Sequence, residues 1–345
     1  MNSFSWIIWL IAVLGALSAT RNPLHLILIL LILGLMTKII KYDRKDNLVP
    51  ISFFPFFLLI ILTAAVFNAL LSHVGSTILF FIPGNVVLIS GPITLEAIVY
   101  GATNGLILSG IFLSFSIFNQ SLSAKTIIRM IPKAFYPLAL IITIAINFLP
   151  SIRHRLEEIR QAQAIRGHQL RNIGDYASLF LPLLIDSLER SMQLAESMTS
   201  RGFVPYQLQS TTPHNRFVII TGMIFFIAGW IVQLSNGNHY AYGLSLLGLF
   251  MIIFWFLWIS KQIPQSTYKR EKWSWLDVII SVIFLSGLCV YIIPLPFIDH
   301  QILIYNAYPT VILPDFDIIV GCVSLCFLIP AFINRGPAHD LVSKR

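Results

Sequence analysis

Two short arginine motifs are the residues of this sequence best suited to a specific interaction. Residues 162–167 (AQAIRG) and 197–202 (SMTSRG) share the pattern small-x-x-x-Arg-Gly and lie 35 residues apart. A glycine just past a helix end, with arginine in the last turn, is ordinary C-terminal capping chemistry. An arginine projecting from a helix end can also enter an acidic groove of a soluble partner and form paired hydrogen bonds there. The two interpretations are compatible.

Both motifs belong to a polar island at residues 151–216. It holds 14 of the 38 charged residues of the chain, including eight arginines and no lysine. Arginine without lysine favours planar, multidentate pairing over a merely solvated charged face. We predict two helices, at 151–166 and 176–201, joined by a turn at 172–175 in which Asp175 caps the second helix. At 1.5 Å per residue, these helices would be about 24–39 Å long.

The rest of the chain has the composition of a membrane protein. Of its 345 residues, 57% are apolar and 11% are charged, and the mean hydropathy is +0.81. Soluble domains carry about 25% charged residues, so a soluble fold is excluded. The net charge of +8 is explained by basic residues in cytoplasmic loops, and we expect no nucleic-acid partner.

Eight segments are apolar enough to cross a bilayer, which takes about 20 residues per helix. The first two are short and are separated by Arg21-Asn22-Pro23, which predicts the tip of a helical hairpin. The crossings are expected at 5–20, 24–40, 51–72, 97–119, 217–234, 241–260, 275–295 and 318–334.

The distribution of basic residues predicts the orientation of these crossings. Lysine and arginine gather at 38–45, at 261–272 and at the C-terminal end, whereas the loop 296–317 holds three aspartates and no basic residue. Basic loops prefer the cytoplasmic side. We therefore predict a multi-pass protein of the cell membrane with both termini in the cytoplasm.

Two further apolar stretches are predicted not to cross. Residues 77–92 are interrupted by Pro83-Gly84-Asn85 and suggest an outer hairpin or re-entrant loop. Residues 123–149 begin with Lys125, Arg129 and Lys133 on one helical face, which is typical of a helix lying in the membrane interface. The chain then divides into an N-terminal bundle (1–122), an interfacial helix with two cytoplasmic helices (123–216) and C-terminal transmembrane helices (217–345).

At the arginine motifs the sequence resembles a known family. Ala164-Ile165-Arg166-Gly167 and Ser200-Arg201-Gly202-Phe203 look like the two signature motifs of the T component of energy-coupling factor (ECF) transporters, the CbiQ-type family. The likeness covers about residues 20–235. Supporting stretches are residues 194–198 (LAESM), Arg21-Asn22-Pro23, residues 91–97 (GPITLEA), Tyr100-Gly101 and Phe118-Asn119.

The resemblance implies an all-α polytopic membrane bundle with cytoplasmic coupling helices, and no catalysis by this chain. Two ABC-type ATPase subunits would drive import of vitamins or metal ions, and a substrate-binding (S) membrane subunit would carry the cargo. The expected ATPase-docking residues are Ala164, Ile165, Arg166, Gly167, Ser200, Arg201 and Gly202. Residues 241–334 extend beyond the common family length, as either a lipid-facing extension or a docking surface.

Other chemistry has little support in the sequence. The chain has no G-x-x-x-x-G-K-[ST] phosphate loop, so the energy of ATP must come from a partner. The eight histidines never take metal-ligand spacing, and we expect neither a metal site nor a cofactor. The alternatives are a stand-alone secondary transporter, which should show internal repeats, and a membrane enzyme, which should show intramembrane carboxylates or histidines.

Overall fold

The computed structural model describes ten stretches of the chain: residues 2–43, 53–83, 91–132, 135–167, 176–203, 213–236, 239–262, 273–293, 300–308 and 310–333. Its contacts form two compact units, Met1–Thr126 with Lys269–Arg345, and Ile127–Tyr268. The described residues are mostly helical, which confirms the predicted all-α membrane class. The first unit joins both ends of the chain, whereas the three-part division at 122 and 216 stays a prediction.

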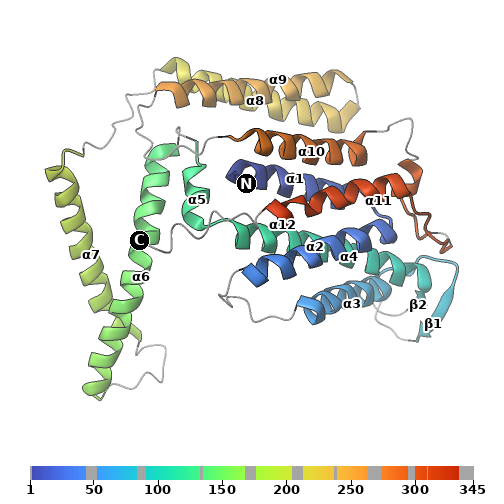
Figure 1. Ribbon diagram of the computed structural model, residues 1–345, viewed down its shortest axis with the longest axis horizontal. Coiled ribbons are helices and arrows are strands. Elements are labelled where there is room, and N and C mark those ends of the chain that lie inside the picture. Colours follow the sequence, from blue (N-terminus) through green and yellow to red (C-terminus); the bar gives the residue numbers. More distant parts are fainter. Residues whose placement is uncertain are drawn as a thin grey trace. The chain divides into compact units, whose positions relative to one another are not determined.

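The first unit is a helical bundle with one small sheet (Figure 1). The short helix α5 (Ala124–Arg129) follows α4, at the residues where this unit ends and the second begins. The elements of the first unit are α1 (Ser3–Ala19), α2 (Pro23–Asp43), α3 (Phe53–Leu71), β1 (Ile78–Ile82), β2 (Gly91–Thr94), α4 (Leu95–Ser121), α10 (Trp275–Ile292), η3 (His300–Leu303), α11 (Ile318–Leu325), η4 (Cys326–Leu328) and α12 (Ile329–Ile333).

The predicted hairpin tip between the first two helices is present and has a clear local cause. Pro23 begins α2, where a missing N–H costs nothing, and the Oδ1 atom of Asn22 accepts a hydrogen bond from the Leu24 N–H at 3.0 Å. The amide Nδ2 of the same Asn22 donates to the carbonyl oxygens of Ile302 (2.9 Å) and Asp315 (2.7 Å). The tip is therefore fixed to a loop almost 300 residues away in sequence.

Residues 78–94 contain the one sheet that the described residues form. β1 pairs antiparallel with β2, with Ile78 opposite Thr94 and Ile82 opposite Gly91. Thr94 then caps α4 by accepting a hydrogen bond from the Ala97 N–H. The predicted hairpin at 77–92 thus coincides with an antiparallel strand pair. Between the two strands, residues 84–90 lie outside the described residues.

The C-terminal helices α10 to α12 belong to the core of the first unit. Phe284, Tyr291 and Phe327 are buried in the same cluster as Trp9 and Leu17 of α1, and the Trp9 indole N–H donates to the Phe327 carbonyl oxygen at 3.0 Å. Within residues 241–334, for which a lipid-facing extension or a docking surface stays a prediction, α10 to α12 contribute buried side chains to this core. Helix α1 thus packs on α10 as well as on α4.

Helices α3 and α4 approach closely through small residues. Gly101 and Gly105 form a G-x-x-x-G pair on α4, and a Cβ atom on either would lie 2.7–2.8 Å from α3 backbone atoms of Ala64 or Ile61. Between lipid-embedded helices, such close contact replaces the hydrophobic driving force that water supplies elsewhere. The pair explains why α3 and α4 pack along most of their length.

The second unit holds α6 (Tyr136–Ile165), α7 (Ala177–Ser200), α8 (Pro213–Asn236) and α9 (His239–Gln262). Helices α8 and α9 lie side by side (Figure 1). Their approach is close, since a Cβ atom on Gly248 of α9 would lie 2.4 Å from the Phe226 nitrogen of α8. The second predicted polar helix, 176–201, coincides with α7, and the turn at 172–175 lies outside the described residues.

The predicted separation between an interfacial helix at 123–149 and a polar helix at 151–166 is wrong. One continuous helix, α6, runs through both stretches with Pro150 in its interior. The abrupt change from apolar to charged residues at 151 therefore falls inside one helix. A proline removes one hydrogen bond of a helix, and the 30-residue helix α6 continues on both sides of Pro150. Helix α7 likewise contains Pro182.

All eight predicted crossings coincide with helices. Among the described residues, four helices are long and apolar enough to cross a membrane, namely Leu95–Ser121, Pro137–Ile165, Phe217–Leu234 and Trp275–Ile292. Five more are apolar but have only 10–17 residues within the described ranges. The inclusion of Pro137–Ile165 shows that α6 has the length of a span, contrary to the predicted 14-residue apolar piece. The number of crossings stays a prediction.

Candidate functional site

The candidate site comprises the C-terminal ends of α6 and α7 and the groove where these helices cross. Side chains link Ser151 to Arg190 and Arg155 to Asp186. Residue numbers rise along α6 as they fall along α7, so the two helices are antiparallel (Figure 1). Their C-terminal ends therefore point in opposite directions. The structure places the two predicted motifs at the two ends of one crossed pair and does not bring them together.

The end of α7 is closed by a complete Schellman motif. Gly202 has a φ of +76°, and its N–H donates to the Thr199 carbonyl oxygen at 2.9 Å. The Phe203 N–H donates to the Met198 carbonyl oxygen at 2.9 Å. This pair of bonds defines the motif, in which the residue after the C-cap adopts the left-handed conformation that favours glycine. Arg201 is the C-cap residue itself.

The end of α6 has the same geometry as far as it is described. Arg166 is the C-cap residue, Gly167 has a φ of +81°, and the Gly167 N–H donates to the Ala164 carbonyl oxygen at 3.0 Å. A Cβ atom on Gly167 or Gly202 would meet nothing within 4 Å. Both glycines are therefore required by backbone conformation, and not by lack of space.

All of the predicted docking residues are exposed. The side chain of Ile165 is 88% exposed, an unusual state for an isoleucine beside a helix end. In the described part of the chain, the guanidinium groups of Arg166 and Arg201 have neither an ion pair nor a hydrogen bond. Two arginines are thus held at fixed helix ends with all their donors free. The exposed residues are Ala164, Ile165, Arg166, Gly167, Ser200, Arg201 and Gly202.

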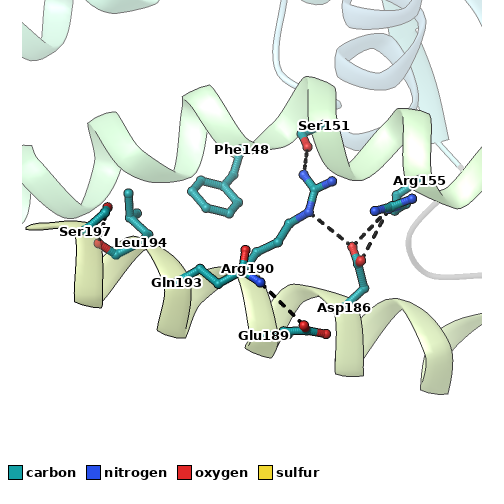
Figure 2. A pocket seen from close by; sticks show the side chains of 9 residues that line it. All are labelled: Phe148, Ser151, Arg155, Asp186, Glu189, Arg190, Gln193, Leu194 and Ser197. Carbon is teal, nitrogen blue, oxygen red and sulfur yellow. Dashed lines mark hydrogen bonds and ion pairs between the residues drawn. The ribbon is translucent and has the colours of Figure 1, made fainter.

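Figure 2 shows that Asp186 is the centre of a polar network at the crossing. Its Oδ1 atom lies 3.3 Å from the Arg155 Nε atom of α6, and its Oδ2 atom lies 3.4 Å from the Arg190 Nε atom of its own helix. Arg190 also donates through Nη1 to the Ser151 hydroxyl of α6. Arg155 in turn pairs with Glu158 at 2.9 Å. The network therefore joins α6 to α7 twice.

This network lines an open groove of about 640 Å³ that Phe148 and Leu194 also line. The side chains of Arg155, Asp186 and Arg190 are 41%, 29% and 36% exposed. Solvent therefore screens each ion pair, which stabilises the crossing only weakly. Sequence reasoning missed these residues. A signal was available, because Arg155 and Arg190 repeat the 35-residue spacing of Arg166 and Arg201.

Two carboxylates near the ends of predicted crossings serve the fold. Glu96 accepts hydrogen bonds from the Ser76 hydroxyl at 3.1 Å and from the Thr77 N–H at 3.0 Å. Asp277 accepts from the Asn2 N–H at 2.9 Å and from the Ser274 N–H at 3.3 Å. Both groups hold loops or helix starts in place.

The comparison with known families identifies the class of membrane protein to which these helices belong. A family model described as CbiQ, cobalt transport protein, matches residues 4–214. The chain belongs to this family. The match covers both arginine motifs and ends within the first turn of α8, so the rest of α8 and all of α9 to α12 lie beyond the part that the family model describes.

Curated relatives show local similarity. The chain is 29% identical to an energy-coupling factor transporter transmembrane protein EcfT of Staphylococcus aureus over 82 residues, 22% of this chain and 31% of the relative. It is 23% identical to an EcfT of Ruminiclostridium cellulolyticum over 118 residues, 31% and 44%. An uncharacterized protein, MG181, of Mycoplasma genitalium is 31% identical over 101 residues, 27% and 24%. The chain thus spans between a quarter and a half of these relatives.

Proposed function

We propose that this chain is the transmembrane coupling (T) subunit of an ATP-driven ECF-type importer for vitamins or metal ions. It acts in the cell membrane, with both termini in the cytoplasm. Two ABC-type ATPase subunits hydrolyse ATP, and this chain transmits their motion to a substrate-binding membrane subunit. The chain itself is non-catalytic.

The observation that carries the proposal is the pair of equivalent helix ends. Arg166 and Arg201 each occupy the C-cap of an exposed helix, and each is followed by a glycine in the left-handed conformation. A guanidinium held by a rigid helix end can form a bidentate pair with a carboxylate and resists rotation in it. Two such ends suit two equivalent acidic grooves, one on each ATPase.

A second feature supports a partner within the membrane. Helix α7 exposes Leu181, Ile185, Leu188 and Met192 at spacings of four, three and four residues, which places them on one helical face. Their exposed fractions range from 58% to 67%. A polar-tipped helix with an uncovered apolar stripe favours contact with another apolar protein surface. We assign this stripe to the substrate-binding subunit.

Co-purification from native membranes tests the proposal. The chain with Arg166→Ala and Arg201→Ala should lose its ATPase subunits, because truncating a charged anchor of an interface costs about 2–5 kcal/mol. Bound ATPase is measured by quantitative mass spectrometry and by ATP hydrolysis of the purified complex. The chain with Arg153→Ala and Arg160→Ala is a matched control, since it loses the same charge from exposed positions of α6 and should retain the ATPases.

Two outcomes would refute the coupling role. One is that the unaltered chain retains no ATPase under conditions in which it stays monodisperse. The other is that the double variant of Arg166 and Arg201 retains as much ATPase as the control does.

A further inference from the structure

The contacts between α6 and α7 are related by an approximate two-fold symmetry. Adding 35 to a residue number of α6 gives the equivalent position on α7, so Ser151 corresponds to Asp186 and Arg155 to Arg190. Exchanging the helices turns the Arg155–Asp186 contact into an Arg190–Ser151 contact. Both of these contacts are present. The crossing is thus built from one arginine contact used twice, in opposite directions.

This symmetry fixes the reach of the two arginine motifs. The two contacts are centred on position 153 of α6 and position 188 of α7. Arg166 and Arg201 each lie 13 residues beyond their centre, which corresponds to about 20 Å of helix. We call the part of each helix from this centre to its arginine motif an arm. The two arms are therefore equally long, and the separation of the motifs depends on the angle and register of the crossing.

We propose that Ser151, Arg155, Asp186 and Arg190 form a positioning clamp that sets this crossing, and so sets the distance between the two docking ends. The assignment rests on the proposed coupling function. The clamp residues do not dock on the ATPases themselves. They act through Arg166 and Arg201, by keeping both within reach of two grooves at the same time.

The four clamp residues depart from the two-fold symmetry at one pair of equivalent positions, and this departure makes the clamp testable. The carboxylate is on α7, where it faces Arg155, whereas the equivalent position on α6 is Ser151, which faces Arg190. Moving the carboxylate to α6 should give an arrangement in which α6 and α7 exchange their roles in the clamp. Ser151→Asp with Asp186→Ser keeps the composition and net charge of the chain, and replaces the Arg155–Asp186 pair by an Arg190 pair with the new carboxylate.

The experiment measures the arm separation directly. Spin labels are placed at Gln161→Cys and Glu196→Cys, two exposed equivalent positions before the motifs, in a full-length chain whose three native cysteines are replaced by alanine. We expect Asp186→Ser to broaden the distance distribution and to weaken ATPase retention on the order of threefold to tenfold, given two solvent-screened contacts. The double variant Ser151→Asp with Asp186→Ser should restore both the narrow distance distribution and the ATPase retention.

Two further variants separate positioning from loss of charge or loss of folding. Glu189→Ser removes a carboxylate from the same groove, where its hydrogen bond runs to Gln193 within α7, and should change neither measurement. Asp186→Asn keeps the side-chain shape and should behave like Asp186→Ser, since the ion pair is lost in both.

The proposed clamp is contradicted if Asp186→Ser leaves the distance distribution narrow. It is also contradicted if Ser151→Asp with Asp186→Ser fails to restore a narrow distribution. The same holds if the separation changes while ATPase retention does not. Failure of the coupling function is a different result, in which the unaltered chain retains no ATPase. The distance measurements on the isolated chain then still decide whether the clamp exists.

Discussion

The first unit and the crossed helices of the second unit use their side chains in opposite ways. In the first unit, α1, α2, α4 and α10 to α12 bury a continuous core that includes Trp9, Leu17, Phe284 and Phe327. In α7 the one buried residue is Leu179, and the described side chains of α6 include none that is buried. One region buries many of its side chains in its own packing, and the other leaves almost all of its described side chains exposed or half-buried.

The difference separates stability from function within one chain. A substitution in the bundle should change folding, because its side chains contact many others. A substitution on α6 or α7 removes few contacts within the chain and should change assembly instead. Variants of the bundle should therefore change thermal stability, and variants of α6 or α7 should change the binding of partners.

The largest effect is expected from deleting residues 263–345. This leaves the whole family-matched region intact but removes the partners of Trp9 and Asn22 in the core and at the hairpin tip. We expect the shortened chain to aggregate on size-exclusion chromatography in detergent. Co-expressing residues 263–345 as a separate polypeptide should restore a monodisperse species. A monodisperse shortened chain with unchanged thermal unfolding would show that the C-terminal helices are peripheral after all.

A matched pair of phenylalanines gives the next largest effect. Phe284 of α10 is fully buried, whereas Phe180 of α7 is 64% exposed. Large-to-small changes at buried aromatic residues cost about 3–5 kcal/mol in soluble proteins, and the packing part of this cost persists between membrane helices. Phe284→Ala should lower the melting temperature clearly and Phe180→Ala should not. Equal shifts for the two variants would remove the contrast between the regions.

Some of this architecture could be predicted from residue patterns alone. Helices in lipid must satisfy their own backbone groups, so long apolar stretches indicated helical structure at all eight predicted crossings. Capping chemistry is equally local, and the patterns ending in Arg166-Gly167 and Arg201-Gly202 placed both helix ends within one residue. Signals of this kind depend on neighbours in sequence, and a single sequence contains them in full.

Other features depend on which helices meet, and a membrane sequence hides this. When most faces of a helix are apolar, periodicity cannot show that α1 packs on α10. The contact between Asn22 and Asp315 joins residues nearly 300 positions apart through a side chain that could equally have been only a helix cap. The predicted boundary between residues 149 and 151 coincides with Pro150, although the backbone of α6 continues through it. The partner of Arg155 is Asp186 because α6 crosses α7 at these residues, and no local pattern specifies that crossing.

Three glycines provide the smallest and most selective comparison. Gly34 of α2 in the bundle, and Gly167 and Gly202 after the arms, all have open space where a Cβ atom would lie. Only the latter two have a positive φ, +81° and +76°. Gly34→Ala should therefore stabilise its helix by roughly 0.5–1 kcal/mol, which differential scanning calorimetry would detect.

Gly202→Ala should strain the cap by about 1 kcal/mol and leave the global melting temperature unchanged, because the arm contributes nothing to the core. Hydrogen exchange should show faster opening of the Gly202 and Phe203 amides, whose acceptors are in the last turn of α7. If instead Gly202→Ala lowered the melting temperature of the whole chain, the arms would have to be part of the cooperative fold, and the separation of stability from assembly would be lost.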